Sequence, residues 1–129
     1  MLPNSFYLAF GNLLYAIAIS DSTVQMEEIE EFHKITRNEL KNIADVPNDE
    51  VLHFNELLAD SGFLNSYHAE IPADIALDKF LAYYLENKKL FPDWIKDFCL
   101  NSVLKVAQAY GGIVTEEKQV IIKLKEAFE

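Results

Sequence analysis

Two stretches of the sequence, one toward each end, follow the same pattern. In each, an apolar run containing Ala is followed by a turn residue, by Val or Ile three places later, and by a Glu-Glu pair six and seven places later. The pattern sets Asp21 opposite Tyr110 and the glutamate pair at 27–28 opposite the pair at 116–117. An apolar run, a turn and an acid-led amphipathic segment are typical of two helices joined by a tight turn. The sequence therefore predicts two helical hairpins built to one plan.

The remaining segments also predict helices. Residues 6–20 are nearly all apolar or small, which is typical of a helix in the middle of a bundle. Gly11 in this run indicates a place where a neighbouring helix approaches closely. Residues 24–43 carry one apolar stripe. Ser22-x-x-Gln25 fits a capping box at its start, but we favour the start that the repeat indicates, near Gln25, with Val24 packed just before it.

The middle of the chain predicts a short helix followed by a loop. A helix break and a new helix start are indicated by Pro47-Asn48-Asp49. The new helix is predicted from the apolar residues Val51, Phe54, Leu57 and Leu58, and we expect it to end at Asp60-Ser61-Gly62. Residues 63–70 have no period and predict a loop or a fragment of helix. Proline opens the next two helices at Pro72 and Pro92, Gly111-Gly112 ends the second of them, and Thr115 is expected to cap the last helix.

These patterns predict an all-α fold. No segment alternates with period two, and no linker divides the chain, so we expect one compact domain over residues 1–129, a bundle of about six or seven helices. The single cysteine, Cys99, excludes an internal disulfide and suits a reducing compartment. The run from 6 to 19 lacks the positive flank of a signal peptide and is too short to span a bilayer, so a cytoplasmic protein is expected. No oligomeric state is predicted.

The charge is strongly acidic. The formal net charge is −10, and residues 42–78 hold eight acids and neither Lys nor Arg. Such a surface repels the phosphates of nucleic acids, so nucleic-acid binding is not expected. A solvated acidic face, a basic protein partner and a bound cation all remain open.

A structural role explains the polar residues of both turns. Asp21 can accept a hydrogen bond from the backbone in an Asx-turn, and Glu27 and Glu28 place negative charge at a helix N-terminus. In the second copy Gly111-Gly112 supplies backbone freedom in place of the acceptor.

The doubled pattern helix-Ala-x-x-Asp-Gly-x-Val/Ile-x-x-Glu-Glu resembles the tellurite-resistance TerB family, including the TerB-like domain of DjlA-type co-chaperones. The resemblance covers mainly residues 14–35 and 103–124. It implies a compact helical protein linked to stress and metal-oxyanion resistance, with an acidic cluster that binds divalent cations. On the matching positions, that cluster would consist of Asp21, Glu27, Glu28, Glu116 and Glu117.

The chain departs from this family pattern at two positions. Ser22 stands where the family has Gly, and Tyr110 replaces the second Asp, which removes one candidate ligand. The J-domain's His-Pro-Asp triplet does not occur, so direct stimulation of an Hsp70 is not implied.

Other catalytic and metal-binding patterns are incomplete. Glu30-x-x-His33 and Glu50-x-x-His53 match the pair found in di-iron bundles, but the first helix offers no acid before Asp21. An EF-hand starting at Asp21 would meet Phe32 at its twelfth position, where calcium needs Glu. Three hypotheses follow: a non-catalytic module that binds a protein partner through an acidic helical surface, a divalent-cation binder with no other cofactor, and a di-iron enzyme.

Overall fold

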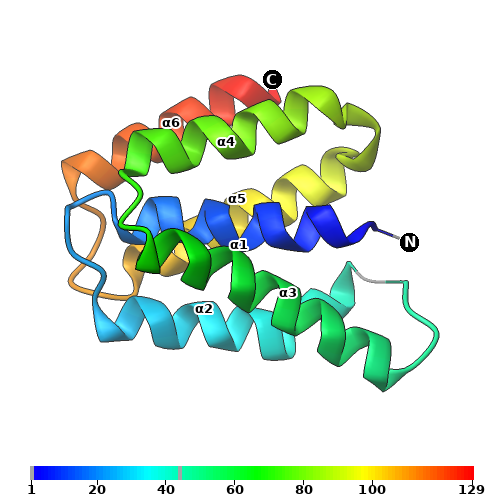
Figure 1. The fold of residues 1–129 in the computed structure, drawn as a ribbon. Helices are drawn as coiled ribbons and strands as arrows, with labels where there is room; N and C mark the ends of the chain where they lie inside the picture. The colour runs from blue at the N-terminus through cyan, green and yellow to red at the C-terminus, as the bar shows by residue number, and fades with distance from the viewer. Residues whose placement is uncertain (1, 44) are drawn as a thin grey trace.

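The structure, a computed structural model, describes residues 2–43 and 45–129. The described residues form six α-helices and no strand, arranged as in Figure 1. This confirms the predicted all-α bundle. In chain order the elements are α1 (Asn4–Ala18), α2 (Met26–Asn38), the 3-10 turn η1 (Leu40–Asn42), α3 (Asp49–His68), α4 (Ala73–Glu86), the 3-10 turn η2 (Lys88–Leu90), α5 (Asp93–Gln108) and α6 (Thr115–Phe128).

Helix α1 occupies the middle of the bundle. It lies between α2 and α3 on one side and α4 and α6 on the other, and it also packs on α5 (Figure 1). Eleven of its fifteen residues are buried, as predicted for a helix that is apolar all round. None of the helices in the described residues is both long and apolar enough to cross a membrane.

A buried polar contact ties α1 to two neighbours. The Asn12 side chain donates a hydrogen bond to the carbonyl of Ala76 in α4 over 2.8 Å. The hydroxyl of Ser66 in α3 donates to the Asn12 side-chain oxygen over 2.7 Å. Because both groups of the amide have partners, the buried asparagine is satisfied and fixes the register of α3 and α4 against α1.

The backbones of α1 and α3 cross at two glycines. A Cβ at Gly11 would overlap the carbonyl of Ala59, and a Cβ at Gly62 would overlap the carbonyl of Leu8. The prediction that Gly11 marks a close helix approach is confirmed. Gly62 is its counterpart on α3.

The prediction of a short third helix followed by a loop at 63–70 is wrong. Helix α3 continues through Gly62 to His68 because that glycine is needed inside the helix crossing, and Phe63 beyond it is buried. The helix ends in a Schellman motif, in which the amide of Ile71 donates to the carbonyl of Ser66 over 3.1 Å. Glu70 holds the left-handed position of this motif at φ 53°. A glutamate there gave no sequence signal for the helix end.

Candidate functional site

The two predicted hairpin turns lie at the same end of the bundle, at the left in Figure 1. One joins α1 to α2 and the other joins α5 to α6, so the chain reverses around Asp21 and Tyr110 as the repeat predicted. The backbones agree at one position, since Ser22 has φ 74° and Gly111, its counterpart in the repeat, has φ 69°, and they differ at the next, where only Gly112 has a positive φ. Ser22 thus adopts the left-handed conformation that favours glycine.

The second helix of each hairpin begins in the same way. The amide of Gln25 donates to a carboxyl oxygen of Glu28 over 2.7 Å, and the amide of Val114 donates to Glu117 over 2.9 Å. Each hydrogen bond is the half of a capping box in which a glutamate in the first turn of a helix accepts from the backbone amide of the N-cap residue. The predicted start of α2 near Gln25 is confirmed.

Thr115 does not cap α6 as predicted. It is the first residue of the helix, and Val114, whose side chain has no acceptor, takes the capping position. Glu117 supplies the acceptor instead. The role predicted for Asp21 is confirmed, because its side-chain oxygen accepts from the amide of Thr23 over 3.2 Å.

Of the five predicted ligands, Glu28 and Glu117 are buried, with 1 % and 2 % of each residue's surface exposed. Each of the two carboxyl groups lies close enough to the other to affect its pKa. Burial raises the pKa of Glu28 to about 7, with smaller upward effects from the charges of Asp21, Glu117 and Glu27, and the amide of Gln25 opposes the shift. The pKa of Glu117 is raised chiefly by burial as well. Two such carboxyls can share a proton or coordinate a cation.

The structure therefore brings some of the predicted cation ligands together and leaves the others apart. Asp21, half-buried in its turn, lies near enough to raise the pKa of both buried glutamates. Glu27 and Glu116 are exposed to solvent. In the described residues, no three His, Cys, Asp or Glu side chains gather closely enough to hold a metal ion.

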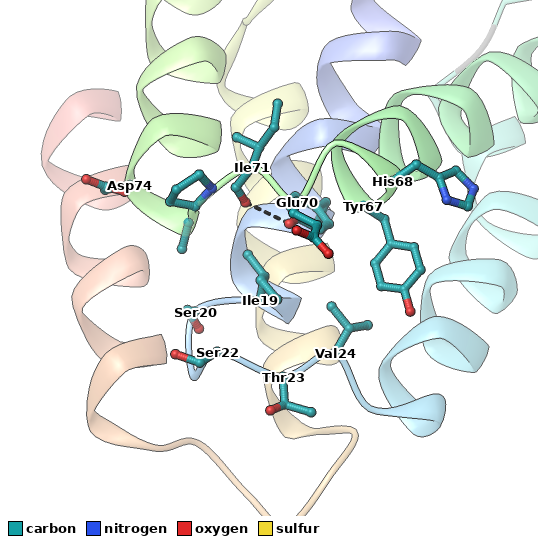
Figure 2. A pocket seen from close by; sticks show the side chains of 13 residues that line it. Ile19, Ser20, Ser22, Thr23, Val24, Tyr67, His68, Glu70, Ile71 and Asp74 are labelled. Atoms are coloured by element: carbon teal, nitrogen blue, oxygen red, sulfur yellow. Dashed lines mark hydrogen bonds between the residues drawn. The ribbon is translucent and has the colours of Figure 1, made fainter.

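An open groove of about 860 Å³ adjoins the first turn and was not predicted. Figure 2 shows that it lies between the α1–α2 loop and the connection from α3 to α4. Apolar side chains that contribute to its lining are Tyr15, Ile19, Val24, Tyr67, Ile71 and Pro72. The hydroxyl of Tyr15 donates to the carbonyl of Ile71 over 2.7 Å. The polar part of the lining includes two carboxylates, the imidazole of His68 and the hydroxyls of Ser20, Ser22 and Thr23, but neither Lys nor Arg.

The carboxylates of the groove are Glu70 and Asp74. In the part of the chain that the structure describes, neither forms an ion pair. Glu70 lies close enough to Tyr15 for its charge to raise the tyrosine pKa, although burial of the tyrosine is the larger cause. The groove thus offers uncompensated negative charge beside an apolar surface.

A strip of large apolar side chains runs along the solvent side of α3. Phe54, Leu57 and Leu64, which we call the α3 face, are 45–50 % exposed, and Tyr67 of the groove follows one turn after Leu64. Phe54 and Leu57 are among the apolar residues from which this helix is predicted. In the structure both side chains are exposed to solvent.

The residues of the di-iron hypothesis do not approach one another as ligands. Glu30 and His33 are exposed on α2. His53 contacts Glu56, with 3.3 Å between the ring nitrogen and a carboxyl oxygen. Cys99 is fully buried, and burial raises the pKa of its thiol, which keeps it protonated and unreactive.

No protein-family model, curated protein or solved structure matches this chain. The chemistry of the site offers two starting points for function. One is the buried pair of carboxyls between the turns. The other is the acidic groove together with the α3 face.

Proposed function

We propose that the chain is a small, non-catalytic, cytoplasmic module of TerB type that binds a protein partner through an acidic helical surface, in a stress or tellurite-type resistance pathway. The family part of this proposal depends on the repeated turn. The binding part depends on one observation: the α3 face exposes three large apolar side chains within the segment that lacks Lys and Arg.

The α3 face suits a basic amphipathic helix as its partner. Exposed apolar side chains at helical spacing, with acids such as Asp49 and Glu50 on the same helix, match an apolar stripe bordered by Lys and Arg. Opposite charges at the border would steer the encounter, and burial of the apolar side chains would supply most of the affinity.

We expect Leu57→Ser combined with Leu64→Ser to weaken binding of a captured partner at least tenfold, roughly 1.4 kcal/mol. The partner is first recovered by affinity purification with the unaltered chain. It is then purified and titrated against the unaltered chain, the double variant and a control variant. Leu85→Ser is the matched control, because Leu85 is 62 % exposed on α4, away from the α3 face. Equal binding by all three proteins, or partners that dissociate as nonspecific, salt-labile material, would count against the proposal.

A divalent-cation site is the second candidate function. The observation that favours it is the pair of buried carboxyls of Glu28 and Glu117, with the charge of Asp21 near enough to act on the pKa of both. Deprotonated carboxylates are the ligands that Ca²⁺ and Mn²⁺ prefer. A cation would also relieve the repulsion between two buried carboxylates.

We expect calorimetric titration with Ca²⁺, Mn²⁺ and Zn²⁺ at pH 8 to show heat for at least one ion. If the dissociation constant is about 0.1 mM, 1 mM metal stabilises the fold by about 1.4 kcal/mol and raises Tm by a few degrees. Glu28→Gln should abolish both signals, whereas Glu30→Gln on the exposed side of α2 should leave them unchanged. Absence of heat and of any Tm shift at millimolar metal would remove this candidate.

A further inference from the structure

The groove continues the α3 face toward the first hairpin turn. Tyr67 and His68, in the last turn of α3, line the groove and lie just beyond Leu64. A segment laid along α3 would therefore reach the groove without turning. Tyr67 of the groove is thus the neighbour of Leu64 of the α3 face on the same helix, and both side chains are exposed.

The apolar side of the groove can accept the stem of a long side chain. Ile19, Val24 and Ile71 are half-buried, so each still presents apolar surface to solvent. The hydroxyl of Tyr15 is already bonded to the carbonyl of Ile71, so it demands no partner from a ligand. Methylene groups pack well against such a surface.

The polar side of the groove has neither Lys nor Arg, and His68 is the one basic side chain in its lining. Figure 2 shows the Glu70 side chain among those lining the groove and Asp74 at one end of it. The Schellman motif at the end of α3 fixes the backbone of Glu70. A cation in the groove would meet one carboxylate held on an ordered backbone and a second nearby.

We propose that this groove binds a lysine or arginine side chain of the partner's segment, with the stem on the apolar side and the cationic head at Glu70. This inference rests on the proposed function and names the anchor of that partner. Arginine suits the site better than lysine, because its planar head can form paired hydrogen bonds with a carboxylate and stack on the Tyr67 ring.

The test uses peptides of defined sequence. Random 12-residue peptides are selected by display against the full chain, and a selected peptide is then titrated by fluorescence anisotropy. We expect the selected peptides to share an arginine or lysine next to apolar residues. Glu70→Gln should weaken binding about tenfold, and raising salt from 50 to 300 mM should weaken it further. The control Glu86→Gln, at an exposed site at the far end of α4, should bind within twofold of the unaltered chain.

The outcomes separate this inference from the proposed function. If Leu57→Ser with Leu64→Ser abolishes peptide binding while Glu70→Gln does not, the groove inference is wrong and the α3 face remains supported. If neither change matters, or no peptide is selected, both fail. Displacement by N-acetyl-arginine amide at the peptide's own affinity would identify a small-cation site and overturn the inference. Amide NMR shifts at Thr23 and Ile71 report occupancy of the groove, and a melting curve confirms that each variant folds.

Discussion

Gly62→Ala is expected to destabilise the fold by about 2 kcal/mol or more, a larger effect than we expect from any surface substitution. The added Cβ would overlap the backbone carbonyl of Leu8, and because that atom belongs to a helix, it cannot rotate away as a side chain could. Overpacking typically costs about 1–3 kcal/mol, and we expect the upper end of that range or more here because two helix backbones must separate. Alanine's better helix propensity recovers about 1 kcal/mol.

Urea denaturation followed by circular dichroism measures this loss directly, and in a thermal melt Tm should fall by about 7 °C or more. Ser61→Ala is the matched control, because Ser61 is the exposed neighbour on the same helix and should change stability by less than about 0.5 kcal/mol. Gly11→Ala should destabilise the fold by a similar amount. The double variant should lose less free energy of unfolding than the sum of the two single variants, because separating the helices once relieves both overlaps. A Gly62→Ala protein as stable as the original would show that α1 and α3 do not cross this closely.

The features that were predictable from the sequence are those encoded by nearby residues. The apolar run of α1, the turn residues of both hairpins and the start of α2 follow from local periodicity and capping. The close approach at Gly11 was predictable because a glycine in a buried helix needs a packing reason. Each of these is a property of a short segment.

The features that were missed depend on segments distant in sequence. From local sequence alone, Gly62 predicts the end of a helix, because its contact with α1 cannot be known. The residue type of Glu70 does not indicate that it adopts a positive φ. The groove joins the loop after α1 to the connection after α3, which no local pattern reveals. The exposed α3 face likewise follows only from which side of α3 the other helices cover.

The burial of two predicted ligands could have been found from spacing. Glu28 precedes the buried residues Phe32 and Ile35 by four and seven positions, which places it on the inward stripe of α2. Glu117 stands three and four positions before Val120 and Ile121 in the same way. Periodicity alone could not show that the two glutamates face each other, because that depends on how the hairpins pack.

The buried carboxyls should make stability depend on pH, and Glu28→Gln should remove most of that dependence. Glu28 has an ordinary pKa of 4.5 when unfolded and about 7 when folded, so between these values the folded protein binds more protons than the unfolded chain. The stabilisation from this group is therefore complete below about pH 4.5 and is lost as pH rises to about 7. The glutamine variant, neutral at every pH, keeps an acceptor for the amide of Gln25.

At pH 8 we accordingly expect Glu28→Gln to be more stable than the unaltered chain by about 1–2 kcal/mol, allowing for solvent screening, and at pH 4.5 the two should coincide. Urea unfolding between these pH values measures the difference, with Glu30→Gln as a control whose curve should follow the unaltered chain. Parallel curves for Glu28→Gln and the unaltered chain would mean that the carboxyls are not buried together. If a divalent cation occupies this site, metal should raise the free energy of unfolding of the unaltered chain only at high pH, because only there are both carboxyls ionised. The same titration therefore separates a shared proton from a bound metal.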